Sequence, residues 1–212
     1  MSDPVYIYVH GFNSSPSSYK ARALAAYLAE QGKSDHFHCP ALSHWPQRAI
    51  EQLEALLDEL ASVPVVLIGS SLGGYYSHYL MQTIGERAQP LSAVLVNPAV
   101  RPYALLERWL GENENIYTAE RYRLTERHLE QLKALDRPAP KALDAYLLLV
   151  QTGDETLDYR EAVEKYAGVA QFVQPGGSHG FDQFEQLIPA IQAFGQGRIE
   201  LPEPTPLPFS AL

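Results

Sequence analysis

The chain has 212 residues, enough for one well-filled domain and few for two. Its 25 acidic and 16 basic residues give a formal net charge of -9, so it lacks the basic excess with which proteins bind nucleic-acid phosphates. No apolar run reaches the roughly 20 residues that span a bilayer, and the N-terminal residues lack a basic and then apolar leader, so we expect a cytoplasmic protein. Cys39 is the only cysteine, which excludes an internal disulfide and a cysteine-rich zinc site.

Strand-like and helix-like stretches alternate along the chain. Short, mostly apolar runs predict strands at residues 5–9, 36–39, 65–68, 91–96, 146–150 and 170–173. Apolar residues at helical spacing predict helices at residues 19–31, 46–60, 75–84, 159–166 and 182–194. This alternation favours an α/β fold: a single domain over residues 1–212, with about six parallel strands in one sheet and helices on both faces.

Two segments depart from this alternation. Residues 101–140 are longer than an ordinary connection and mix charged with aromatic side chains; two helices, at 103–110 and 118–134, would fit. Because such an excursion lies beyond the carboxyl ends of the strands, we interpret residues 101–140 as a lid or cap insertion; the alternative is an elaborated connection that does not touch substrate.

The tail at residues 200–212 contains four prolines, which exclude a helix or a central strand and predict an extended segment.

The sequence Gly-Ser-Ser-Leu-Gly-Gly at residues 69–74 lies between a predicted strand and a predicted helix. At a junction of strand and helix, a serine with a small residue two positions before it and another two positions after it is typical of a nucleophile elbow. This tight turn lifts the serine above the sheet edge. We expect that positions 69 and 73 require glycine, because a Cβ atom on Gly69 or Gly73 would collide with the neighbouring strand or helix. Ser71 is therefore the candidate nucleophile, at a helix N-terminus that favours negative charge.

A serine hydroxyl becomes a good nucleophile when an imidazole takes its proton and a carboxylate orients that imidazole. Both groups follow later strands: Asp154 comes just after the strand that ends at residue 150, and His179 lies in a glycine-rich loop after the last strand. The order Ser71, Asp154, His179 is the chain order of the α/β-hydrolases, in which all three loops meet at one sheet edge. These residues form the candidate catalytic triad.

Two other acidic residues compete with Asp154. Asp158 lies four residues further on and is the reserve acid. Asp182 follows His179 so closely that a role as a helix cap is the better interpretation.

Three other histidines lie near the second predicted strand. A metal cluster of His36, His38 and His44 is conceivable, but their spacing, with Cys39 among them, fits no established zinc pattern. We expect structural roles for them and no bound metal.

The loop after the first strand supplies the remaining requirement of acyl transfer. A tetrahedral intermediate needs amide donors aimed at its oxygen anion, and these come from the residue after the nucleophile and from the loop after the neighbouring strand. Leu72 and Phe12 occupy those positions, and Gly11 permits a close backbone approach. Phe12 and Leu72 are therefore the candidate oxyanion hole, and His10 is interpreted as a brace for this loop rather than as a catalytic base.

Four stretches of sequence together resemble the YqiA-type esterases, a small bacterial branch of the α/β-hydrolase superfamily. They are YVHGFNSSP at 8–16, GSSLGGYY at 69–76, VNPAVRP at 96–102 and GENEN at 111–115, and the similarity extends over about residues 5–194. The resemblance implies an α/β-hydrolase fold with a shortened sheet, and activity on carboxylic esters or acyl thioesters. By this match Ser71, Asp154 and His179 take the triad places, and Phe12 and Leu72 take the amide-donor places.

The sequence therefore predicts a serine hydrolase that cleaves a small ester or acyl thioester through an acyl-enzyme on Ser71, with no cofactor or metal required. Two alternatives use the same fold and machinery: a serine peptidase or a carbon-carbon hydrolase. A non-catalytic binding protein on a hydrolase scaffold is the third. The physiological substrate, the acyl chain length and the oligomeric state stay open.

Overall fold

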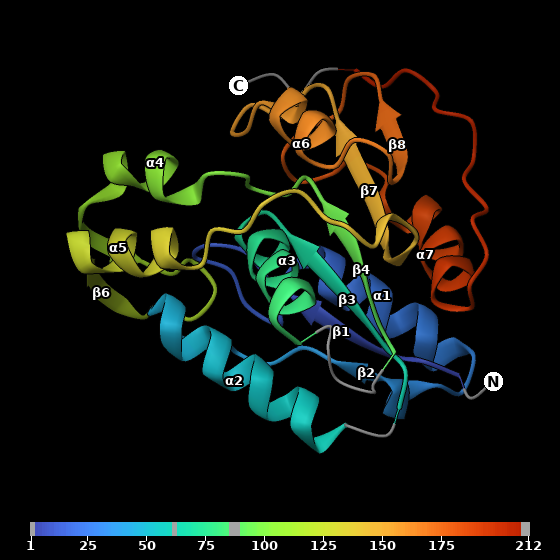
Figure 1. Cartoon of the computed structure of the whole chain (residues 1–212), viewed down its shortest axis with the longest axis horizontal. Helices are drawn as coiled ribbons and strands as arrows, with labels where there is room; N and C mark the ends of the chain where they lie inside the picture. Colours follow the sequence, from blue (N-terminus) through green and yellow to red (C-terminus); the bar gives the residue numbers. More distant parts are fainter. Residues whose placement is uncertain (1–2, 61–62, 85–89, 209–212) are drawn as a thin grey trace.

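The computed structural model describes residues 3–60, 63–84 and 90–208; the last four residues of the proline-rich tail, 209–212, lie outside them. Six parallel strands form one sheet in the order β2-β1-β3-β4-β7-β8 (Figure 1). These strands are β1 Val5–Val9, β2 Phe37–His38, β3 Val65–Ser70, β4 Leu91–Val96, β7 Tyr146–Gln151 and β8 Ala170–Gln174. The predicted six-stranded parallel sheet is thus confirmed for the described part of the chain.

The central strands are apolar along their whole length because both faces of the sheet are covered. Ile7 of β1 is in register with Leu67 of β3, which pairs in turn with Ala93 of β4, and all three are fully buried in one core. The next residue of each strand points to the opposite face and is buried in the second core. The sheet is therefore the middle layer between two hydrophobic cores.

Helices cover both faces, as the alternation of the sequence predicts (Figure 1). One face carries α1 Tyr19–Glu30 and α7 Ile188–Gly195, and the other carries α2 Pro46–Glu59, α3 Leu72–Ile84 and α6 Tyr159–Lys165.

The expected last helix at residues 182–194 is wrong in its first part. Gln183 has a left-handed backbone with φ of 59°, and a short 3₁₀ helix, η4 Phe184–Leu187, precedes α7. Pro189 lies in the first turn of α7, where its missing N–H costs no hydrogen bond. The proline therefore marks a helix start at Ile188 rather than the middle of a longer helix.

Residues 101–140, called the insertion below, contain less helix than the sequence predicts. The elements are α4 Pro102–Leu106, the 3₁₀ helix η2 Glu107–Trp109, the antiparallel pair β5 Gly111–Glu114 and β6 Arg121–Leu124, and α5 Glu126–Ala134. The expected helix at 118–134 is thus wrong over its first half. Asn115 closes the hairpin because its side-chain oxygen accepts from the amides of Tyr117 and Thr118, and Ala119 adopts a φ of 58°.

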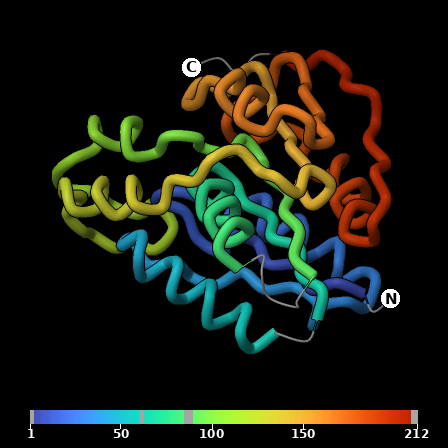
Figure 2. Tube along the Cα trace, in the orientation of Figure 1, coloured from blue at the N-terminus to red at the C-terminus, as the bar shows by residue number. Residues whose placement is uncertain are grey.

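The insertion is docked on the loop that follows β1 (Figure 2). The Asn115 side-chain amide donates to the carbonyl oxygen of Ser14 at 2.8 Å, and the Tyr122 hydroxyl donates to the Asn13 side-chain oxygen at 2.6 Å. His44 and His128 are hydrogen-bonded ring to ring at 3.1 Å, which ties α5 to the segment before α2. The insertion therefore lies over the carboxyl end of β1.

The described part of the proline-rich tail is extended, as its composition predicts, and lies along β8 (Figures 1 and 2). The Leu207 amide donates to the carbonyl oxygen of Pro175 at 2.8 Å, and the Gly177 amide donates to that of Pro208 at 3.0 Å. The Gln174 amide group also donates to the carbonyl oxygen of Thr205. The tail thereby supports the loop that follows β8.

Helix α3 packs so closely on the sheet that two positions admit only glycine. A Cβ atom on Gly73 would lie 1.9 Å from the carbonyl oxygen of Val9 in β1, and one on Gly69 would lie 2.5 Å from the carbonyl oxygen of Gly73. Both distances are far below van der Waals contact. The close approach of α3 to β1 thus depends on Gly73.

Gly73→Ala is expected to lower the free energy of unfolding by about 3 kcal/mol or to prevent folding, because overpacking against rigid backbone costs this much. The intrinsic helix preference of alanine over glycine, about 1 kcal/mol, is too small to offset it. Denaturant unfolding measures the change. Gly180→Ala is the control, since its Cβ would meet nothing nearer than the Ser178 hydroxyl oxygen at 3.3 Å. Equal stability of the two variants would contradict the packing argument.

His78 of α3 is a fully buried histidine in a network of neutral partners. Its Nε2 donates to the carbonyl oxygen of Pro138 at 2.8 Å, and its Nδ1 accepts from the Tyr146 hydroxyl at 3.2 Å. Burial lowers the pKa of His78 to about 4. The imidazole therefore stays neutral in the folded protein at pH values at which an unfolded histidine is charged.

The free energy of unfolding is expected to fall by about 1–2 kcal/mol between pH 7 and pH 5 because of His78 alone. The unfolded chain takes up a proton below its ordinary pKa of about 6.5 while the folded chain does not, so stability is lost as the pH falls. Urea unfolding of the wild type and of His78→Gln over this range isolates the effect. The variant should lose less stability on acidification; identical pH slopes would refute the assignment.

Candidate active site

The elbow between β3 and α3 gives Ser71 an unusual backbone. Ser71 has a φ of 54°, in the left-handed region that residues other than glycine, asparagine and aspartate rarely adopt. Its amide donates to the carbonyl oxygen of Val96 at 3.1 Å, and its carbonyl oxygen accepts from the amides of Gly74 and Ala99, each at 3.0 Å. The end of β4 thus holds the strained turn in place and fixes the direction of the hydroxyl.

The structure brings Ser71, His179 and Asp154 into one hydrogen-bonded line. The Ser71 hydroxyl donates to Nε2 of His179 at 3.1 Å, and Nδ1 of His179 donates to Oδ2 of Asp154 at 2.8 Å. This pattern sets the neutral tautomer, with the proton on Nδ1 and the lone pair of Nε2 facing the hydroxyl. The Asp154 side chain is 2% exposed and that of His179 is 25% exposed, so the imidazole edge at Ser71 is open to a substrate while its carboxylate partner is covered.

Asp154 is held by the start of its own loop. Its Oδ1 accepts from the backbone amides of Thr156 and Leu157, each at 2.8 Å, which leaves Oδ2 for the imidazole. The carboxylate therefore has a single orientation, directed at His179.

The two competing carboxylates lie in other interactions. Asp158 accepts from the backbone amide of Arg160 at 3.0 Å and pairs with its guanidinium, so that it caps α6, and these bonds lower its pKa. The expected role of Asp182 as a helix cap is wrong, because its carboxylate accepts from the Ser178 hydroxyl at 2.6 Å and Gln183 precedes the next helical turn. The sequence placed Asp154 first because it lies just after the strand end, and the contacts of Asp158 and Asp182 agree with that order.

Two polar residues at strand ends clamp the loop that carries His179, and the sequence analysis missed both. The Asn97 side-chain amide donates to the carbonyl oxygens of Ser178 and His179 at 3.0 and 3.2 Å, and its oxygen accepts from the Gln151 amide at 2.9 Å. The Gln151 side-chain oxygen accepts from the amides of Ser178 and Asp182. Their signal in the sequence was a side-chain amide directly at the end of an apolar strand.

The loop after β1 lies against the elbow. A Cβ atom on Gly11 would lie 3.2 Å from the Cβ atom of Ser71, so the backbone of this loop approaches the hydroxyl closely. Within the described residues, the amides of Phe12 and Leu72 donate to no protein acceptor and stay available to a bound oxygen atom. His10 holds the loop: its Nδ1 donates to the carbonyl oxygen of Gly11, and its Nε2 accepts from the Leu42 amide, each at 3.1 Å. Burial lowers the pKa of His10, in keeping with a neutral brace.

A cavity of about 310 Å³ opens at Ser71 and His179. Most of its remaining wall comes from three segments that are distant in sequence: the loop after β1, the first turn of α1 and the hairpin tip of the insertion. The lining residues from these segments include Phe12, Ser18, Lys20, Ile116 and Tyr117. The insertion thus contributes part of the cavity wall.

Two of the three histidines considered for a metal site, His36 and His44, make other contacts. His36 donates from Nδ1 to the carbonyl oxygen of Pro4 at 3.0 Å, and His44 stacks on Tyr122 with ring centroids 4.2 Å apart. In the described ranges no group of three or more His, Cys, Asp or Glu side chains converges as metal ligands would. In the same ranges no helix combines the length and apolar character of a membrane span.

Comparison with solved structures places the fold among hydrolases. Est1E from Butyrivibrio proteoclasticus, solved with ferulic acid bound, is 16% identical with a TM-score of 0.67 over 92% of this chain and 89% of that one. Alpha/beta hydrolase domain-containing protein 10 from mouse is 16% identical with a TM-score of 0.67 over 88% and 87%. The monoacylglycerol lipase of Paleococcus ferrophilus is 14% identical with a TM-score of 0.59 over 92% and 97%. These likenesses show an α/β-hydrolase fold similar to that of esterases.

The sequence itself matches one family over residues 5–196, nearly its whole length. This match agrees with the resemblance to YqiA-type proteins that the four sequence motifs indicate. The chain therefore belongs to the Uncharacterised protein family (UPF0227), a YqiA-like family with the α/β-hydrolase fold.

Proposed function

We propose that this protein is a serine hydrolase that cleaves carboxylic esters or acyl thioesters through an acyl-enzyme on Ser71. The observation that carries the proposal is the continuous hydrogen-bonded line from the Ser71 hydroxyl through His179 to the buried carboxylate of Asp154. In this line each group has the partner that its role requires: a base for the hydroxyl, and a carboxylate that orients the base.

The proposed reaction has two halves. In the first, Nε2 of His179 takes the hydroxyl proton while the Ser71 oxygen attacks the substrate carbonyl carbon, and the resulting oxygen anion accepts hydrogen bonds from the amides of Phe12 and Leu72. The intermediate collapses, the bond to the alcohol or thiol breaks, and the leaving group receives the proton from His179. In the second half, His179 deprotonates a water molecule that attacks the acyl-enzyme; the bond between the acyl carbon and the Ser71 oxygen breaks, the Ser71 oxygen receives the proton from His179, and the acid is released.

Two of the structural neighbours support a small ester as one member of this substrate class. Est1E binds ferulic acid, a carboxylic acid, and a further structural neighbour is a monoacylglycerol lipase. As part of the same proposal, the insertion acts as a cap that shields the acyl-enzyme, since Ile116 and Tyr117 line the cavity around Ser71. A panel of esters, thioesters and aminoacyl amides distinguishes this activity from that of a peptidase.

Ser71→Ala is expected to reduce kcat/KM for a short-chain chromogenic ester by at least about 10³-fold, because losing the nucleophile removes the acyl-enzyme route. A fluorophosphonate probe should form an adduct on Ser71 in the wild type, visible by mass spectrometry, and none in the variant. Ser92→Ala, at the amino end of β4, is the matched control and should behave as the wild type. Undiminished turnover by Ser71→Ala would overturn the proposal.

Asp154→Asn is expected to reduce kcat by about 10³- to 10⁴-fold, because an amide cannot stabilise the charged imidazole and favours the wrong tautomer. Asp158→Asn should stay within about threefold of the wild type, because asparagine also caps a helix and this residue contacts Arg160 instead. Steady-state kinetics on the same ester compare the two variants. The acid assignment is wrong if their ranking is reversed.

A further inference from the structure

The cavity at Ser71 contains one cationic side chain for which the proposed reaction has no use. Lys20, in the first turn of α1, lines this cavity together with Ser71 and His179. Its ammonium donates to the carbonyl oxygen of Gly180 at 2.7 Å. This bond uses one of three N–H groups, so two remain for another acceptor. The contact with the residue after His179 also places the charge beside the proposed base.

The first turn of α1 offers further donors in the same place. Ser18 is the residue before this 12-residue helix, and it is only 8% exposed, yet its hydroxyl caps no amide and, among the described residues, makes no hydrogen bond of ordinary geometry, only a weak interaction with the Tyr8 hydroxyl. The backbone amides of residues 19–21 likewise donate to no described acceptor. A buried hydroxyl without a hydrogen bond of ordinary geometry is costly, so a helix start with several unused donors is suited to an anion.

The charge balance of the cavity points the same way. The chain as a whole carries a formal net charge of -9, but no acidic residue occurs among the described residues that line this cavity. Tyr8 and Ser70 add two hydroxyl groups to the wall, and burial raises the pKa of Tyr8 so that it stays a neutral donor. Burial also lowers the pKa of Lys20 to about 8, opposed in part by the charge of Asp154, so the ammonium form still predominates at pH 7.

We propose that Lys20, the Ser18 hydroxyl and the amino end of α1 form an anion subsite beside the nucleophile, and that the preferred substrates are esters or thioesters that carry a carboxylate or phosphate group near the scissile carbonyl. The inference rests on the proposed function and specifies its substrate class. The ammonium supplies the charge, whereas the hydroxyl and helix amides supply directed hydrogen bonds. A neutral ester of the same size leaves these donors unpaired, which gives the subsite its selectivity.

Two pairs of chromogenic substrates test the subsite at pH 7. In the first pair the charge is on the acid: an aryl monoester of glutaric acid and the aryl ester of hexanoic acid. In the second it is on the alcohol: the butyrate esters of 4-hydroxybenzoic acid and of its methyl ester. The measured quantity is the ratio of kcat/KM for the anionic and neutral members, since this ratio cancels any general disturbance of the loop at His179.

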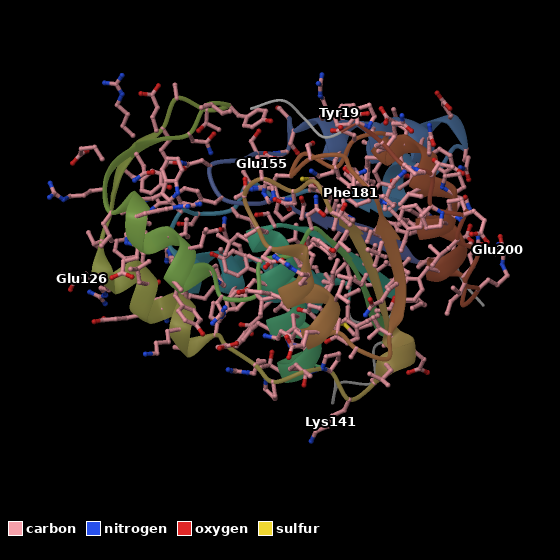
Figure 3. All side chains as sticks on the ribbon, turned by 90° about the horizontal axis from the view of Figure 1, so that it is seen from above. Tyr19, Glu126, Lys141, Glu155, Phe181 and Glu200 are labelled. Atoms are coloured by element: carbon pink, nitrogen blue, oxygen red, sulfur yellow. The ribbon has the colours of Figure 1, made fainter. Side chains whose placement is uncertain are left out.

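The Lys20→Met variant should lower this ratio by about 10- to 100-fold in at least one pair, the range expected for a charge-assisted hydrogen bond. Lys20→Arg should restore part of the preference, and Ser18→Ala should reduce it less than Lys20→Met does. Lys141→Met is the matched control, because Lys141 is exposed and lies at the margin of the view in Figure 3 opposite to Tyr19, the neighbour of Lys20. Its ratio should equal that of the wild type.

The outcomes separate the two proposals. If hydrolysis depends on Ser71 but the ratio is the same for wild type and Lys20→Met in both pairs, the anion subsite does not exist and the hydrolase proposal stands. If Ser71→Ala hydrolyses the neutral esters as fast as the wild type, the hydrolase proposal fails, and the subsite, which specifies a substrate of that reaction, fails with it.

Discussion

The geometry of the candidate site depends on the contact between α3 and β1 at Gly73. A single additional carbon atom at this position would overlap the carbonyl oxygen of Val9, so the helix and strand meet backbone to backbone. This contact sets where α3 begins, and the elbow must therefore turn within one residue, which gives Ser71 its left-handed backbone. The strain is maintained because Ser71 is hydrogen-bonded to the end of β4 and to the first turn of α3, which leaves the turn no alternative path.

The opposite half of the site depends on polar side chains buried at strand ends. The side chains of Asn97, after β4, and Gln151, at the end of β7, form hydrogen bonds with backbone groups of the loop that carries His179. These backbone groups lie beyond the strand ends, where no neighbouring strand can pair with them. Inside the protein such hydrogen bonds are strong when every group is paired, and costly when one is not. The position of the imidazole is thus determined by the ends of three neighbouring strands, and it follows from the strand order β4-β7-β8.

The cavity walls differ in character, and the difference follows from where each segment originates. The first turn of α1 brings a cation and unused donors, whereas the tip of the insertion brings Ile116 and Tyr117, of which Ile116 is 84% exposed. An apolar rim next to a cationic wall is what the proposed substrates, with both apolar and anionic parts, would require. The insertion reaches this position because Asn115 and Tyr122 bind the loop after β1, so the insertion and this loop form one docked unit.

Local patterns in the sequence determined the sheet, most helices and the three loops that carry Ser71, Asp154 and His179, because apolar runs and glycine turns depend on neighbours in the chain. They misjudged the insertion, where Arg121 to Leu124 alternate as a strand does but lie within a stretch that also fits a helix. Only the tertiary structure decided that Asp154 rather than Asp158 faces the imidazole, that Asn97 and Gln151 clamp its loop, and that Lys20 enters the cavity. These outcomes depend on which segments meet across the sheet, and spacing along the chain carries no information about the direction of a side chain at such a junction.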